Sequence, residues 1–145
     1  MDLRATLDAP CSPEVLFAQV DDLARYPAWL GIVARADSAA AMDGDPGPAW
    51  VVDLRARLGP LARSKRLRMV RAECTKFAAV RVERREDDGR THARWLLEAE
   101  VAPIGEGSRL AMRLHYGGGL LGPVIERLLA EEVERAKPRL LALVS

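Results

Sequence analysis

Glu132 is the residue whose type and surroundings most strongly suggest chemistry in this chain. Helical phase places it between Leu128 and Ile125, inside an apolar arc. An unpaired carboxylate there would be costly and would tend to take up a proton, so Glu132 could hydrogen-bond a ligand or act as a general acid. In the alternative interpretation, it reaches an arginine or the rim of the arc. A single such residue makes no catalytic constellation.

The other reactive side chains predict neither a catalytic nor a metal site. Cys11 and Cys74 stand alone without CxxC spacing, which disfavours a zinc site or a disulfide framework. His92 and His115 fall on the outward faces of their strands, with no partner placed to complete a triad or a metal site. We therefore predict no catalytic residue, no metal ion and no cofactor.

The size and composition of the chain limit the elements that can position these residues. With 145 residues, 49% hydrophobic and 30% charged, the chain is expected to form one domain spanning residues 1–145. It has no long apolar run and no leader-like start, so we expect a cytoplasmic protein. The net charge of +1 argues against a dedicated nucleic-acid binder.

Two short helices are predicted after a first strand at residues 1–8. Ser12 is a suitable N-cap and Pro13 fits the first helical position, where its missing N–H costs nothing. A second helix starts from Asp21 or Asp22 and should stop near Arg25, because the proline that follows Tyr26 disfavours helical geometry there.

Strands occupy most of the chain from Trp50 onward, where apolar residues recur at every second position. Asp88-Gly89 is a strong signal for a two-residue hairpin turn, because both central residues of that turn need positive φ. We count about seven strands and predict an α+β fold built on an antiparallel meander.

The last third predicts one long helix after the glycines at 117–119. A helical period places an apolar arc on one side of it, made by Leu121, Ile125, Leu128, Leu129, Val133, Ala136 and Leu140. Pro138 removes a hydrogen bond to the carbonyl of Glu134, so a kink or loosening is expected in the last two turns.

This pattern resembles the START-like (SRPBCC) superfamily, and most closely its small bacterial polyketide cyclase/dehydrase and lipid-transport members. The resemblance runs from Leu3 to about Val144 and rests on four motifs: Tyr26-Pro27-x-Trp29, Asp88-Gly89-Arg90, the strand of Trp95, and Tyr116-Gly117-Gly118. It implies a helix-grip fold, in which a curved antiparallel sheet of about seven strands wraps around the long C-terminal helix and leaves a hydrophobic cavity.

Small residues on the inward face support such a cavity, because they leave room beneath a helix about 10 Å away. These are Ala56, Ala78, Ala93 and Ala99. Tyr26 and Trp29 follow the second helix, which in the resembled family lies near the cavity mouth, and they either gate the ligand or only seat the short helices. The predicted ligand-binding residues are Tyr26, Trp29, Trp50, Leu54, Leu67, Met69, Val82, Trp95, Leu97, Met112, Leu114, Tyr116, Ile125, Leu129 and Glu132.

Three functions remain open at this point. The first is binding or transport of a small hydrophobic ligand such as a lipid, quinone or polyketide-like ring, by a monomer or weak homodimer that touches membrane surfaces transiently. The second is a polyketide aromatase/cyclase or dehydratase that uses the same cavity, with Glu132 or Tyr116 handling protons. The third is a module that interacts with a protein or the ribosome through a basic tract. In the alternative interpretation, this tract is only a solvated outer face whose charges are balanced by neighbouring strands. That tract contains Arg55, Arg57, Arg63, Lys65, Arg66, Arg68 and Arg71.

Overall fold

The computed structural model describes residues 1–118 and 123–145, apart from the side chains of Leu58 and Leu61. Leu121, expected on the apolar arc, and Gly119 lie outside the described residues. The elements are β1 (Asp2–Ala9), α1 (Pro13–Phe17), the 3-10 helix η1 (Leu23–Ala28), β2 (Val33–Ala39), β3 (Ala49–Leu58), β4 (Leu61–Thr75), β5 (Ala79–Arg84), β6 (Trp95–Ile104), β7 (Gly107–Tyr116) and α2 (Pro123–Val144). This is the predicted α+β order.

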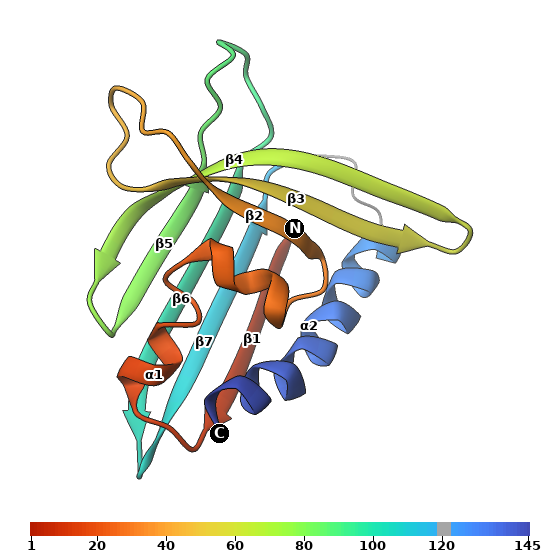
Figure 1. Ribbon diagram of the computed structural model, residues 1–145. Helices are drawn as coiled ribbons and strands as arrows, with labels where there is room; N and C mark the ends of the chain where they lie inside the picture. Colours follow the sequence, from red (N-terminus) through yellow and green to blue (C-terminus); the bar gives the residue numbers. More distant parts are fainter. Residues whose placement is uncertain (119–122) are drawn as a thin grey trace.

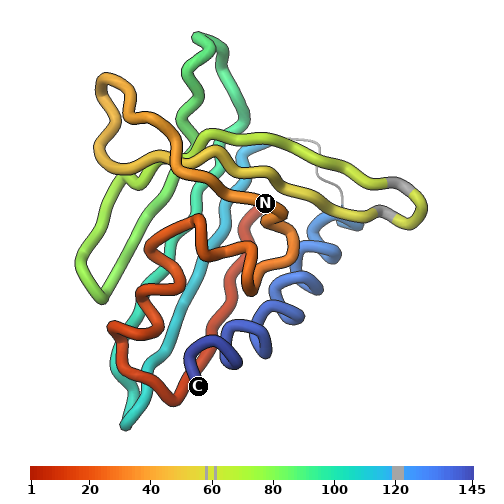
Figure 2. The backbone as a smooth tube through the Cα atoms, in the orientation of Figure 1, coloured from red at the N-terminus to blue at the C-terminus, as the bar shows by residue number. Residues whose placement is uncertain are grey.

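All seven strands form one antiparallel sheet in the order β1-β7-β6-β5-β4-β3-β2. The first strand pairs with the last, from Asp2 opposite His115 to Ala9 opposite Ser108. The sheet curves, and its inner face carries α1 and η1 at one side and α2 alongside β1 (Figure 1). The backbone trace shows the β3–β4 hairpin extending past the start of α2 (Figure 2). The helix-grip prediction is confirmed.

The core lies between this inner face and the helices. Strand alternation brings Trp50 and Val52 of β3, opposite Met69 and Leu67 of β4, to the inner face, as the period of two predicted. The helix α2 contributes four buried residues, Leu129, Ala136, Leu140 and Val144. Pro138 lies inside α2 and does not end it: the helix runs on to Val144.

The second short helix differs from its prediction. Asp22 caps it as expected, accepting a hydrogen bond from the Ala24 amide at 2.9 Å. It then continues past Arg25 through Pro27 to Ala28, as a 3-10 helix. The turn around the proline is held by the amides of Trp29 and Leu30, which both donate to the carbonyl of Tyr26.

The prediction of a two-residue hairpin at Asp88-Gly89 is wrong. Strand β5 ends at Arg84 and β6 begins at Trp95, so residues 85–94 form a long connection in which Gly89 does have a positive φ of 70°. Glu86 turns back into the protein and accepts from the Arg68 amide and from Arg84 Nε, both at 3.0 Å.

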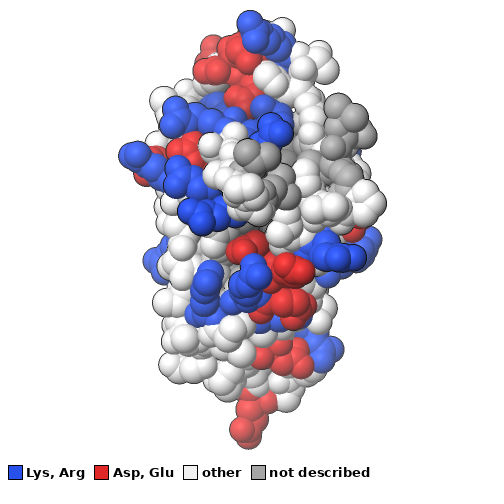
Figure 3. Space-filling model, turned by 90° about the vertical axis from the view of Figure 1, so that its right-hand side faces the viewer, with Lys and Arg blue, Asp and Glu red and all other residues white. Residues whose placement is uncertain are grey.

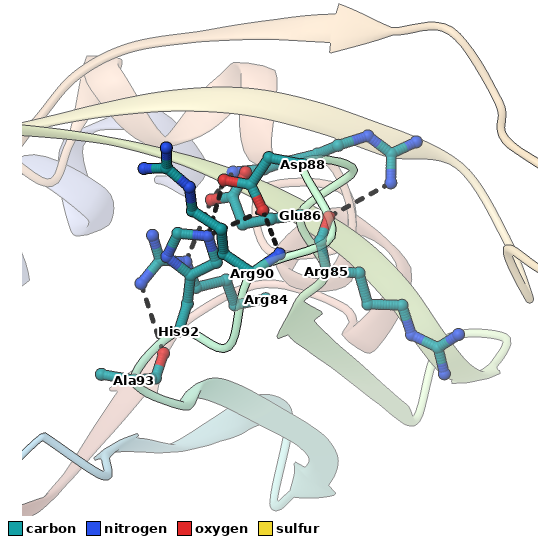
Figure 4. Close-up of polar contacts among 8 residues, drawn as sticks. Arg84, Arg85, Glu86, Asp88, Arg90, His92 and Ala93 are labelled. Carbon is teal, nitrogen blue, oxygen red and sulfur yellow. Dashed lines mark hydrogen bonds and ion pairs between the residues drawn. The ribbon is translucent and has the colours of Figure 1, made fainter.

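Because of these contacts, residue 86 does not continue β5, and strand pairing ends before Asp88-Gly89. Figure 4 shows the connection closed on itself, with Asp88 bonded to the Arg90 amide and to His92. Ala93 consequently lies in this connection rather than on a strand. Ala78, also expected to face inward from a strand, lies in the β4–β5 turn.

Candidate ligand-binding site

A cavity of about 80 Å³ lies between α2 and the β1–β7 side of the sheet. Its lining is almost wholly apolar: strands β1, β6 and β7 and the end of η1 form one wall and α2 the other. The lining residues are Leu3, Arg4, Ala5, Thr6, Leu7, Trp29, Leu30, Leu97, Leu110, Met112, Leu114, Val133, Ala136, Lys137 and Leu140. On the α2 side, Ala136 lines this space with a small side chain, and a larger side chain there would occupy part of it.

Four of the predicted ligand-binding residues line this cavity, namely Trp29, Leu97, Met112 and Leu114. Most of the others pack into the core beside it and are held by neighbouring side chains. These are Tyr26, Trp50, Leu54, Leu67, Met69, Val82, Trp95 and Tyr116. On α2, Leu129 is buried and Ile125 is partly buried, and neither residue lines the cavity.

Tyr26 and Trp29 have different roles in this arrangement. Tyr26 is 1% exposed, and its hydroxyl donates to the carbonyl of Val20 at 2.9 Å, which fixes the ring in the core. Burial raises the pKa of Tyr26 well above its ordinary value. The Trp29 ring stacks obliquely on Tyr26 with centroids 4.7 Å apart and forms part of the cavity wall.

Glu132 lies at the rim of α2 rather than in the cavity wall. Its side chain is 29% exposed and pairs with Arg135 one turn along the same helix. Its carboxylate also lies beside Gly31, where a β-carbon would come within 3.0 Å of Oε2. The geometry therefore matches the interpretation in which Glu132 reaches an arginine.

The histidines and cysteines are separated from one another. His92 pairs with Asp88 at 2.8 Å and His115 with Asp2 at 3.2 Å, each at the surface. Cys11 is half-buried, and burial raises the pKa of its thiol, while Cys74 is exposed. Within residues 1–118 and 123–145, no group of three or more His, Cys, Asp or Glu side chains is arranged to hold a metal ion.

The basic tract of β3 and β4 does not form one surface. Arg66 pairs with Asp53 at 2.8 Å on the outer face, and Arg68 is buried against Asp45 at 2.7 Å. Lys65 belongs to the other face, because it stands opposite Leu54 and two residues before Leu67. Seen from the α2 side, basic and acidic side chains lie next to one another in both the upper and the lower half (Figure 3).

Four side chains gather at the upper end of the inner face, where β6 begins and β7 ends; sequence reasoning had named Trp95 and Tyr116 as ligand-binding residues but missed that Lys65 and Arg84 lie beside them. We call Lys65, Arg84, Trp95 and Tyr116 the upper cluster. Arg84 stands opposite Met69 on the inner face and is 8% exposed. Alternation along β4 and β5 already places Lys65 with Leu67 and Arg84 with Val82, so the signal was present in the strand period.

Comparison with known proteins identifies the relatives of this arrangement. Residues 1–144 match the family model described as polyketide cyclase/dehydrase and lipid transport. A START superfamily protein from Mycobacterium smegmatis is 16% identical, with a TM-score of 0.73 over 99% of this chain and 96% of that one. A protein from Thermus thermophilus is 21% identical, with a TM-score of 0.74 and coverage of 99% and 97%.

A further similar structure is that of an enzyme. The di-domain aromatase/cyclase StfQ from the steffimycin biosynthetic pathway is 14% identical, with a TM-score of 0.70 over 99% of this chain and 50% of that one. At these identities the structural likeness shows the fold. No curated protein sequence matches the chain. In the described part of the chain, no helix is both long and apolar enough to cross a membrane.

Proposed function

The chain belongs to the polyketide cyclase/dehydrase and lipid-transport family, and from that membership we propose that it binds and carries a small hydrophobic ligand between α2 and the sheet. The observation that carries this proposal is the apolar lining of the cavity. A pocket lined in this way binds by removing apolar surface from water, and it can accept ligands of varied shape.

The ligand has to enlarge this cavity when it binds. Pockets for small molecules usually measure about 300 to 1,000 Å³, against about 80 Å³ here. Outward movement of α2 would supply the difference. Among the described residues, the ion pairs of α2 all lie within the helix, linking Arg135 to Glu131 and Glu132 and Lys137 to Glu134. Such a movement therefore breaks apolar contacts but no ion pair.

The cyclase alternative requires at least two convergent polar side chains inside the cavity. Arg4 and Thr6 alternate along β1 with Leu3, Ala5 and Leu7, so their side chains belong to the opposite face of the strand. Lys137 is engaged with Glu134. This lining favours carriage of an unchanged ligand over its conversion.

Native mass spectrometry of the freshly purified protein, followed by organic extraction, tests the proposal. We expect a stoichiometric adduct that extraction releases as an apolar molecule, chemically unchanged after incubation with the protein. The same spectrum reports whether the carrier is a monomer or a weak homodimer. A protein that remains free of adduct when lipids, quinones and polyketide mimics are offered would overturn the proposal, and conversion of an offered polyketide mimic would favour the cyclase.

A further inference from the structure

The upper cluster contains a buried hydrogen-bond donor without an acceptor. Trp95 is 7% exposed, and its Nε1 makes no hydrogen bond to any described residue. The other two indoles are satisfied: Trp29 Nε1 donates to the carbonyl of Gln19 and Trp50 Nε1 to Asp22 Oδ1. A buried N–H without a partner costs free energy, and such a group in a native protein calls for an explanation, such as local strain, a functional role, or a bound water or ion.

A positive charge without a carboxylate partner lies over the same aromatic pair. The Trp95 and Tyr116 rings are 4.6 Å apart, and Lys65 Nζ lies 5.7 Å from the centroid of Tyr116. Among the described residues, no carboxylate lies within ion-pair distance of Lys65, whereas Arg84 is neutralised by Glu86 at 3.0 Å. Lys65 reaches Tyr116 from three strands away in the sheet order, which the curvature of the sheet allows.

The electrostatic environment favours an added anion at this place. Partial burial lowers the pKa of the Lys65 ammonium, the positive charge of Arg84 lowers it further, and Glu86 acts in the opposite sense. Arg63 of the neighbouring β3–β4 hairpin lies two residues before Lys65 on the same face and is also exposed. The charge of Arg63 adds to the positive charge that an incoming anion meets near the cluster.

The upper cluster adjoins the apolar cavity on the same face of the sheet. Leu97 and Leu114 line the cavity, and each lies two residues from Trp95 or Tyr116 along its strand. That spacing corresponds to about 7 Å. A ligand with an apolar body and one polar end can therefore occupy both places at once.

We propose that the upper cluster binds the carboxylate of an amphipathic ligand, with Trp95 Nε1 and Lys65 Nζ as its two donors, while the apolar part of that ligand enters the cavity; this rests on the proposed function. A carboxylate offers one oxygen to each donor. A phosphomonoester, with a charge of about −1.5 to −2, would exceed the single positive charge left unpaired here. The Tyr116 ring contacts Trp95 and lies beneath Lys65, and it packs against Gly118, where a β-carbon would collide with the Tyr116 hydroxyl.

The test compares octanoate with 1-octanol, which share an apolar chain and differ at the head group. Affinities are measured by calorimetry below the concentration at which octanoate forms micelles, and the indole N–H signals are followed by ¹⁵N NMR. We expect octanoate to bind at least about tenfold more tightly, because a hydrogen bond to a charged acceptor and an ion pair are added. Only the Trp95 signal, assigned by its contacts with the Tyr116 ring, should move strongly downfield.

Lys65→Gln supplies the variant and Lys76→Gln its control. Lys65 is exposed, so its replacement leaves the fold intact and should reduce the octanoate preference by about fivefold, the size of an exposed ion pair. Lys76 also lies over an aromatic ring, 5.0 Å from the centroid of Phe77, but in the β4–β5 turn, and its replacement should change nothing.

The outcomes separate this inference from the function on which it rests. Equal affinity for octanoate and octanol, with an unmoved Trp95 signal, would overturn the carboxylate subsite and leave the hydrophobic carrier standing. Binding of neither probe would overturn both. A preference for octanoate that Lys65→Gln leaves unchanged would remove Lys65 from the subsite and would contradict the assignment.

Discussion

Filling the cavity at Ala136 should stabilise the protein and abolish ligand binding at the same time. Ala136 is buried on α2 and lines the space of about 80 Å³. Cavity volume costs about 24 cal/mol per Å³, so filling all of it with Ala136→Leu would contribute at most about 1.9 kcal/mol. Imperfect fit of the new side chain offsets part of this gain. We expect a net increase of about 1 kcal/mol in the free energy of unfolding, or about 3 °C in Tm.

The assay is urea unfolding followed by tryptophan fluorescence, together with native mass spectrometry of the bound adduct. Ala142→Leu is the matched control, because Ala142 is exposed on the same helix and carries the same change in helix propensity. It should stay within about 0.5 kcal/mol of wild type and keep its adduct. An Ala136→Leu protein that retained a full adduct would refute the placement of the site. An Ala136→Leu protein destabilised by more than about 2 kcal/mol would show that the cavity cannot accommodate the leucine side chain.

Three further substitutions test contacts outside the cavity. Gly107→Ala should cost about 1 to 3 kcal/mol in urea unfolding, since its β-carbon would collide with the backbone carbonyl of Ala9, which cannot move aside; a neutral result would contradict that contact. Asp45→Asn should lower Tm above about pH 5, and the deficit should shrink as the pH falls below 3.8. The hydrogen bond from Arg68 lowers the pKa of Asp45 below its ordinary value of 3.8, so its contribution is present above that value and lost below it; a pH-independent deficit would exclude this linkage. Trp50→Phe removes an indole hydrogen bond to the cap of η1 and should cost about 1 kcal/mol in the same unfolding assay, and an unchanged stability would show that the bond contributes nothing.

The order and type of the elements could be predicted from the sequence because the signals that specify them are local. A period of two placed Trp50 and Leu67 on the inner face, and a period of 3.6 located the C-terminal helix, with Leu129 among its buried residues. The cap at Asp22 was likewise a matter of neighbouring residues. Each of these patterns spans only a few positions, so no knowledge of distant contacts was needed.

Local patterns failed where a distant partner decided the outcome. The Asp88-Gly89 signal correctly predicted the positive φ of Gly89. The expected hairpin is nevertheless a long connection, because Glu86 accepts hydrogen bonds from Arg68 and Arg84. Glu132 is a different case: helical phase placed it in the apolar arc, but its partner Arg135 is a near neighbour on the same helix, as the alternative interpretation of the sequence allowed.

The strand and helix periods predicted most of the inward-facing residues, although not Ala78 and Ala93, which lie outside the strands. Which inward residues line the cavity and which pack against neighbours depends on the tertiary structure. That choice depends on where Ala136 of α2 falls above β1 and β7. It depends equally on the curvature that carries Lys65 across three strands to Tyr116. The strand period specifies the face on which a side chain lies, but the distance across a curved sheet is set by the twist of all seven strands together.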